Sequence, residues 1–390
     1  MSEERTAVVV GAGIGGLATA ALLTADGWKV TVVEKSPDDE PVGAAVALWS
    51  NAFRALELVD AQRCDDLRQR VSLRGQGGIR TPEGGYLARF DAAAMHRRVG
   101  GPPILVGRPE LHELLLAKVP TEAVLFGATV TDVRQSPEHA IVSTSDGRQL
   151  GAELVVAADG IGSRLRTLVD PASDVESAGY VTWRGLVPAG AVTPDAGGET
   201  WGRGQRFGYM ALSDDRIYWY ATLAGADSRL WEQTSGSMEL DHLQHLFADW
   251  HEPIPALLQA TPIGAVLRHD VAYVWPLPKA YVSGRLALVG DAAHAMTPDL
   301  AQGACQALED AVELAWAVRN STDLATGLRT YDRRRRPRTA RLAAQARTLA
   351  RVSQLDRPFA ASLRDVMVRM MPKSLALKGF ESAAEWRPPA

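Results

Sequence analysis

The strongest restriction on the fold lies in the first 34 residues. An apolar run at 6–10 (TAVVV) leads into Gly-Ala-Gly-Ile-Gly-Gly at 11–16, then a stretch of small and apolar residues at 17–25, and then a second apolar run at 29–34 (KVTVVE). The order strand, glycine turn, helix, strand is typical of the start of a parallel β-sheet. The glycines match the G-x-G-x-x-G pattern of dinucleotide-binding folds.

Each glycine of this motif has a distinct physical use. Gly11 permits a tight turn, Gly13 lets a pyrophosphate approach the backbone, and Gly16 lets the helix pack closely on the strand. The helix N-terminus then presents free N–H groups to the phosphates. Glu34 ends the second strand, where a carboxylate can accept hydrogen bonds from ribose hydroxyls. A carboxylate there disfavours a 2′-phosphate, so the motif predicts the adenosine of FAD or NAD and does not separate the two.

Two more predicted strands end in an aspartate. Residues 153–158 lead into Asp159-Gly160, and residues 285–289 lead into Gly290-Asp291. Asp291 could bind the hydroxyls of a second polyol such as a ribityl chain. The small residues between Pro298 and Gly303 precede a predicted helix, whose N-terminus suits the pyrimidine edge of a flavin. The alternative for both motifs is an ordinary turn at the start of a helix.

The middle of the chain has a different pattern of residues. Residues 178–187, 206–212 and 216–223 alternate and are rich in aromatic and β-branched side chains, which predicts antiparallel strands with a turn-rich link at 193–204. Residues 303–350 are predicted to be largely helical. We therefore expect a cofactor-binding domain split between 1–175 and 276–350, a β-rich substrate domain at 176–275 and a C-terminal helical segment at 351–390.

Taken together, these motifs resemble the group A flavoprotein monooxygenases, of which p-hydroxybenzoate hydroxylase is the familiar member. GAGIGGL with Glu34, ADGIGSR at 158–164, and GDAAHAMTP with QGACQALEDA from 290 onward correspond to the three FAD motifs of that family, over nearly the whole chain. The fold implied is α/β: a Rossmann-like FAD-binding domain, split in sequence, with an inserted antiparallel-sheet substrate domain. The resemblance implies cofactor contacts from Gly11, Gly13, Ile14, Gly16, Glu34, Lys35, Val46, Arg108, Val130, Asp159, Gly160, Asp291, Pro298 and Gly303.

Within that set the resemblance gives several residues a specific place. Val46 lies in the 43–57 segment that would run beside the isoalloxazine ring, Arg108 would meet FAD, and Val130 would flank the adenine. Asp159 and Gly160 would serve both FAD and NAD(P)H. Two positions depart from the family pattern, because Ala45 and Ala301 stand where glycine is frequent. Both changes bear on how the flavin ring moves rather than on FAD binding.

The resemblance also implies the reaction. NADH or NADPH would reduce FAD, the reduced flavin would capture O2 as a C4a-hydroperoxide, and one oxygen atom would pass to a small electron-rich substrate. The substrate would be aromatic, heteroaromatic or polyketide-like, and the outcome hydroxylation or epoxidation. No metal ion or protein nucleophile is required. Water must be kept out, so that the oxidant does not decay. An FAD-dependent dehydrogenase or reductase, or a non-catalytic flavin-binding redox protein, remains an alternative.

Two residues are candidates for substrate contact. Alternation puts Arg206, Gly208 and Met210 on one face of their strand, and Tyr218, Tyr220 and Thr222 on one face of the next. We predict that Arg206 and Tyr218 face the flavin, where Arg206 could bind a phenolate-like anion and Tyr218 could hydrogen-bond it. The alternative is that both are ordinary residues of the sheet. Asp299 is expected to line the same space. His294 belongs to the Gly-Asp motif, and a structural role is predicted for it.

Composition excludes other classes of function. The net charge is −4, and the Arg-rich stretch at 333–341 is predicted to be a solvated helix face rather than a nucleic-acid site. Only two cysteines occur, Cys64 and Cys305, far apart in sequence, which indicates neither a disulfide framework nor a metal site and favours the cytosol. No run of about 18 apolar residues is present, so no membrane span is expected.

Overall fold

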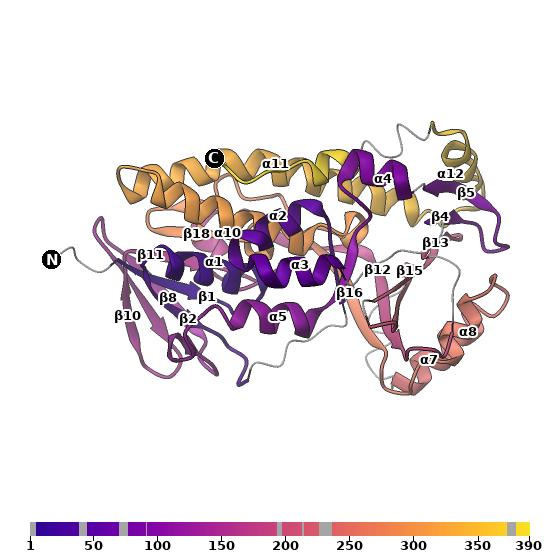
Figure 1. The fold of residues 1–390 in the computed structure, drawn as a ribbon, viewed down its shortest axis with the longest axis horizontal. Helices are drawn as coiled ribbons and strands as arrows, with labels where there is room; N and C mark the ends of the chain where they lie inside the picture. The colour runs from indigo at the N-terminus through magenta and orange to yellow at the C-terminus, as the bar shows by residue number, and fades with distance from the viewer. Residues whose placement is uncertain are drawn as a thin grey trace.

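The computed structural model describes residues 5–38, 45–69, 77–90, 92–192, 197–212, 214–225, 236–372 and 380–390. It is an α/β fold built around two large sheets, which lie toward opposite ends of the molecule with the long helix α11 (Leu324–Ser353) running along one side (Figure 1). Among the described residues, no helix is both long and apolar enough to cross a membrane.

The first sheet is largely parallel, in the order β17-β18-β11-β1-β2-β7, and only β17 runs antiparallel to its neighbour. Its central strands are almost completely buried, because helix α1 (Ile14–Ala25) packs against β1 and β2, and a small antiparallel sheet at 130–152 packs against β1 and β11. Its strands are β1 (Thr6–Val10), β2 (Lys29–Val33), β7 (Val124–Leu125), β11 (Leu154–Ala157), β17 (Val282–Ser283) and β18 (Leu286–Leu288).

Several helices pack together beside this sheet and contribute to its core. Helix α1 packs against α5 and α10, and α10 packs in turn against α2 and α11. The helices of this part are α1 (Ile14–Ala25), α2 (Ser50–Val59), α3 (Ala61–Gln69), α4 (Ala92–Val99), α5 (Arg108–Leu116), α6 (Arg166–Val169), α9 (Asp291–His294) and α10 (Gly303–Arg319), with short 3-10 turns at Thr121–Ala123 and Pro298–Leu300. Two small sheets flank it: β3 (Ala45–Leu48) with β6 (Ile104–Gly107), and β8 (Val130–Gln135), β9 (Ala140–Thr144) and β10 (Gln149–Ala152).

The second sheet is mostly antiparallel, in the order β16-β12-β15-β14-β13-β4-β5. Its strands are β12 (Asp174–Val187), β13 (Gly198–Trp201), β14 (Gln205–Ala211), β15 (Ile217–Ala224), β16 (Leu267–Trp275), β4 (Gly77–Arg80) and β5 (Tyr86–Phe90). Trp183, Phe207 and Trp219 point from one face into a core formed with α7 (Gly236–Leu246) and α8 (Ile254–Gln259). The other face is left to line a cavity.

The structure adds detail that the sequence patterns missed. The 193–204 region, predicted to be only a turn-rich link, contains strand β13, which pairs with β14 and lies parallel to β4. Because β4 and β5 come from residues 77–90, the antiparallel sheet is not confined to 176–275. Helix α11 continues past residue 350 to Ser353, whereas α12 (Pro358–Met370) lies in the C-terminal segment that was predicted to be helical. The division of the chain into domains stays a prediction.

The interpretation of the Arg-rich stretch as a solvated helix face agrees with the exposure of Arg333, Arg334 and Arg341 on α11, but it is wrong for Arg335. Arg335 is fully buried on α11 and forms ion pairs with Glu309 and Asp310 of α10. Arg338 also pairs with Glu309, and Arg334 pairs with Glu313. Three acidic residues of α10 thus pair with arginines of α11, and the network holds the two helices together.

Candidate active site

The predicted cofactor motifs meet at one edge of the parallel sheet. Strands β18, β11, β1 and β2 are neighbours and all point the same way. Their carboxyl ends therefore deliver Gly290-Asp291, Asp159, Gly11 and Glu34 to the same side of the molecule. Hydrogen bonds from Gly11 N to Val33 O (2.8 Å) and from Ala158 N to Val10 O (2.8 Å) join the segments just beyond the strands. In open parallel sheets, this edge is where ligands bind.

The geometry of the glycine motif agrees with the uses expected for it. Gly11 has a φ of +105°. A Cβ on Gly16 would come within 2.0 Å of Gly11 O, so only glycine allows α1 to pack this closely. A Cβ on Gly13, by contrast, would meet nothing within 4 Å, so the backbone there borders open space. Ile14 is the first residue of α1, whose first turn has no side-chain cap and no acidic residue.

Glu34 lies beside this loop. Its carboxylate accepts hydrogen bonds from Ala12 N (2.7 Å) and Ser36 N (2.8 Å), which fixes its orientation. Lys35 follows and is exposed. Val130, at the start of β8, is buried close by, because the chain leading to it pairs Ala128 N with Glu34 O at 3.0 Å. The predicted adenosine contacts are thus brought together.

The Asp-Gly motif contributes an incompletely satisfied carboxylate. Oδ2 of Asp159 accepts from Arg164 N at 3.1 Å, whereas its buried Oδ1 has no hydrogen-bond partner among the described residues. Gly160 follows with a φ of +80°, a conformation that favours glycine. A buried unpaired oxygen is costly, so this atom is suited to receive a donor from a ligand.

A cavity of about 1380 Å³ lies between the two large sheets. Val46, Asp291, Pro298 and Gly303 line it from the cofactor-motif side. Arg108, the first residue of α5, does not line the cavity, but its charge lies near that of Asp291. Desolvation lowers the pKa of Arg108, and the Asp291 carboxylate acts against that shift.

The opposite wall is the free face of the antiparallel sheet. Arg206, Met210, Tyr218, Tyr220 and Thr222 all line the cavity, so the predicted alternation on both strands is confirmed. Tyr220 faces Gly208 on the neighbouring strand, where a Cβ would lie 2.3 Å from the ring. Glycine at this position therefore lets the Tyr220 ring lie across β14.

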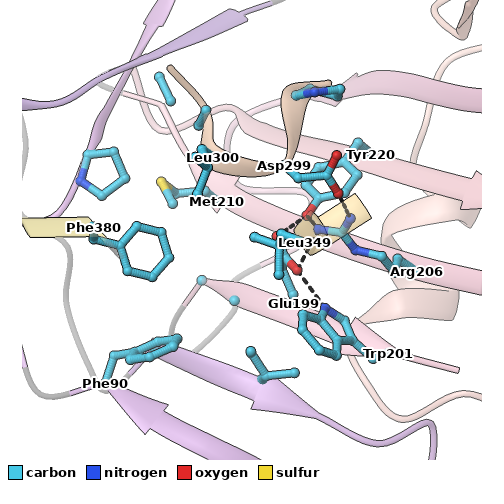
Figure 2. A pocket seen from close by; sticks show the side chains of 18 of the residues that line it. Phe90, Glu199, Trp201, Arg206, Met210, Tyr220, Asp299, Leu300, Leu349 and Phe380 are labelled. Carbon is cyan, nitrogen blue, oxygen red and sulfur yellow. Dashed lines mark hydrogen bonds and ion pairs between the residues drawn. The ribbon is translucent and has the colours of Figure 1, made fainter. Parts of the chain in front are cut away.

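Arg206 is held by protein carboxylates. Nη1 contacts Asp299 Oδ1 at 2.5 Å, and Nη2 contacts Glu199 Oε2 at 2.8 Å (Figure 2). Nη1 also donates to Ser353 Oγ at 3.0 Å. Glu199 also accepts from Tyr220, and Asp299 accepts from Tyr180 at 2.9 Å. Burial acts against ionisation of Glu199, but the charge of Arg206 outweighs it and lowers the pKa of Glu199. Two carboxylates thus surround one guanidinium, which weakens the expectation that Arg206 binds an anion.

Tyr218 has a different environment. Burial raises the pKa of its phenol, and the nearby Arg184 opposes that shift. The hydroxyl therefore stays protonated near neutral pH and can donate a hydrogen bond. Arg184 projects from β12 into the same cavity, and no ion pair involves it within the described part of the chain.

The segment before α10 connects the two walls. Asp299 lies in the 3-10 turn Pro298–Leu300, lines the cavity as expected, and contacts Arg206 of the sheet. Ala301 follows with φ +51° and ψ +42°, a left-handed conformation that an alanine adopts at a cost. Ala301, which stands where glycine is frequent in the family pattern, therefore occupies a position where glycine would be unstrained.

The histidines have structural partners. His294 is buried and bonds to Asp310 Oδ2 at 2.6 Å, which supports the structural role predicted for it. His112 contacts the carbonyl of Ala12 in the glycine loop at 2.9 Å. Among the described residues no cluster of metal-ligating side chains occurs.

Sequence reasoning missed Glu199 and the bonding roles of Tyr180 and Tyr220. Glu199 belongs to the stretch interpreted as a turn, although its alternation with Trp201 on β13 was a usable signal. Tyr180 begins the aromatic run at 180–183, but only the pairing of β12 with β15 puts it on the cavity face.

Comparisons with known proteins agree with this architecture. The family model for the FAD binding domain matches residues 4–346. Aurachin C monooxygenase/isomerase of Stigmatella aurantiaca is 32% identical over 376 residues, covering 95% of each chain. The 2-heptyl-3-hydroxy-4(1H)-quinolone synthase of Pseudomonas aeruginosa is 31% identical over 373 residues, also covering 95% of each.

A solved structure is similar over the whole length. The crystal structure of Klebsiella pneumoniae HpxO complexed with FAD and uric acid superposes with a TM-score of 0.87 at 28% identity, covering 99% of this chain and 98% of that one. With the strand-end motifs at one sheet edge and the cavity between the two sheets, these matches identify the chain as a flavoprotein oxidoreductase of the group A FAD-dependent monooxygenase family, with a p-hydroxybenzoate hydroxylase-like fold.

Proposed function

We propose that this protein uses NADH or NADPH and O2 to insert one oxygen atom into a planar heteroaromatic substrate bound in the cavity. The observation that carries the proposal is the composition of the cavity walls: one contains residues of the FAD motifs, and the other is a sheet face bearing buried tyrosines and arginines. The relatives named above are an aurachin C monooxygenase/isomerase and a synthase of 2-heptyl-3-hydroxy-4(1H)-quinolone, and HpxO was crystallised with uric acid, which supports a heteroaromatic ring.

The residues at the sheet edge suit FAD. The open space at Gly13 and the uncapped N-terminus of α1 would accommodate the pyrophosphate, and Glu34 would bind the adenosine ribose beside Val130. Asp159 offers a buried acceptor without a partner, and Asp291 would hold the ribityl oxygens. We assign Ile14, Gly16, Lys35, Val46, Arg108, Gly160, Pro298 and Gly303 to the remaining surroundings of the cofactor.

When bound, FAD supplies the hydride acceptor and the activation of O2; this chain supplies position and charge. The protonated hydroxyl of Tyr218 would donate a hydrogen bond to an oxygen or nitrogen of the substrate ring. Arg184, which has no ion-pair partner among the described residues, would balance negative charge on that ring. Arg206 would act as a positioning residue, because its charge already serves Glu199 and Asp299.

Isotope labelling tests the proposal. The purified full-length protein is supplied with NADH or NADPH and a panel of hydroxylated, amino-substituted and fused heteroaromatic rings under 18O2. We expect substrate-stimulated nicotinamide oxidation and one 18O atom in the product. Substrate turnover without label would indicate an FAD-dependent dehydrogenase, and the absence of any substrate stimulation would indicate a non-catalytic flavoprotein. A cytosolic location remains a prediction.

A further inference from the structure

The cavity is larger than one aromatic ring needs, and its two ends differ in chemistry. At one end lie Glu199, Arg206, Tyr220 and Asp299. At the other end, Figure 2 shows the rings of Phe90 and Phe380 facing the open space, with Leu300 and Met210 between them and the charged cluster. The total volume of about 1380 Å³ exceeds the roughly 300–1,000 Å³ of common small-molecule pockets, although the flavin ring would occupy part of it.

Contacts between aromatic rings form the wall of the apolar end. Phe380 stacks on Trp49 with ring centroids 5.2 Å apart and meets Phe90 edge-on at 6.3 Å. These rings come from three distant parts of the chain: the end of β3, the end of β5 and the C-terminal segment. Aromatic pairs in such arrangements form stable apolar walls. Trp49 is buried, whereas Phe90 and Phe380 keep part of their surface toward the cavity.

Side chains from two further helices extend this wall. Leu349 and Val352 come from the last turns of α11, and Val368 comes from the last turns of α12. The arginines at this end, Arg89, Arg341 and Arg369, are exposed, which places their charges toward solvent. No carboxylate from the described residues lines the apolar end: the acidic lining residues are Glu199, Asp291 and Asp299. A polar or charged substituent placed there would lose hydration without gaining a partner.

We propose that the substrate is amphipathic, with a planar hydrogen-bonding ring at the Tyr218–Tyr220 face and an alkyl chain in the compartment formed by Phe90, Phe380, Leu349 and Val368. This inference rests on the proposed monooxygenase function and narrows its substrate class. The chain adds affinity through burial of methylene groups. It also fills space that water would otherwise occupy beside the site of oxygen transfer.

A chain-length series tests this inference. The probes are 4(1H)-quinolones that carry methyl, propyl, pentyl, heptyl or nonyl at position 2, and binding to the FAD-loaded protein is followed by the change in flavin absorbance. Burial of each methylene is worth about 0.8 kcal/mol, so we expect the Kd to fall about fourfold per added carbon until the compartment is full. A constant Kd across the series, or no binding by any member, overturns the proposal.

Two variants test where the alkyl chain of the substrate binds. Phe380→Ala should weaken heptyl binding by tenfold or more and leave methyl binding within about twofold. Phe359→Ala is the matched control, because this ring on α12 is 82% exposed and does not line the cavity. Val368→Trp should fill the compartment and reject heptyl while retaining methyl. Equal effects on heptyl and methyl compounds would overturn the assignment. The 18O2 experiment tests oxygen transfer independently. The proposed substrate class can therefore be wrong even if the protein proves to be a monooxygenase.

Discussion

Arg206 and Asp299 form a buried ion pair, with 2.5 Å between Nη1 and Oδ1. The exposed fractions of the two side chains are 4% and 0%. Arg206 belongs to the antiparallel sheet, and Asp299 belongs to the segment that precedes α10 and that we assign to the flavin ring. The pair therefore joins the two walls of the cavity, one proposed to contact the substrate and the other the cofactor.

Loss of this guanidinium should destabilise the protein strongly. Arg206→Met leaves Glu199 and Asp299 buried without their cation, and breaking a buried pair costs about 3–5 kcal/mol in the free energy of unfolding. The control is Arg216→Met, which breaks an exposed pair with Asp214 worth at most about 1 kcal/mol. Denaturant unfolding measures both. Similar losses for the two variants would contradict the positioning role of Arg206.

Two glycines of the N-terminal motif, Gly13 and Gly16, should differ in role: Gly16 should matter for stability and Gly13 for FAD binding. Gly16→Ala puts a Cβ within 2.0 Å of Gly11 O and should destabilise the apoprotein. Gly13→Ala meets nothing within 4 Å, so the apoprotein should unfold like the parent while its affinity for FAD falls at least tenfold. Apoprotein unfolding and quenching of FAD fluorescence provide the two measurements. Full FAD affinity in Gly13→Ala would remove that residue from the pyrophosphate site.

Asp291 should control cofactor retention. Asp291→Ala removes the carboxylate proposed to hold the ribityl oxygens, so the purified variant should lose its yellow colour and its flavin absorbance. The control is Asp249→Ala. Asp249 is exposed and lies between α7 and α8, so this variant should retain its full complement of FAD. An Asp291→Ala protein with its full complement of FAD would contradict the assignment.

Ala301 should be a strained position. The left-handed backbone lowers the stability of the protein with alanine by about 1–2 kcal/mol. Glycine avoids this strain but lowers the stability by about 0.4–1 kcal/mol, because it increases the conformational entropy of the unfolded chain. Ala301→Gly should therefore be at least as stable as the parent. Ala301→Val, with a β-branched side chain at positive φ, should be less stable by more than about 1 kcal/mol. If valine were tolerated as well as glycine, the inferred strain would be absent.

Acid should weaken the α10–α11 network through Asp310. Burial acts to raise the pKa of this carboxyl, but the charges of His294 and Arg335 outweigh it, and the pKa is lowered in the folded protein. The stability that Asp310 contributes is therefore complete above its unfolded pKa of about 3.9 and is lost as the pH falls through the folded value. Apoprotein denaturation between pH 7 and pH 3 should show a shallower acid decline in Asp310→Asn. An unchanged slope would mean that Asp310 does not titrate differently on folding.

The predicted elements that proved accurate carry their information locally. Residues 6–10 form a strand with the expected bounds and residues 17–25 lie within helix α1, because the apolar pattern and length within one segment determine each. Contacts between distant segments do not follow in this way: the hydroxyl of Ser50, the first residue of α2, donates to Val99 O at 2.6 Å. That bond depends on a residue 49 positions away, which no local pattern reveals.

By itself, the sequence determined the cofactor half of this protein. The glycines and strand-end carboxylates encode their geometry in a few adjacent residues, since backbone conformation and side-chain direction follow from residue type. Only the tertiary structure decided which charges meet. Arg335 turns inward because Glu309 and Asp310 lie opposite it, and Arg206 is neutralised because Glu199 and Asp299 converge on it from separate segments. Charge neutralisation depends on the distance between the charges in space, and residues 93 positions apart come close together only when the chain folds.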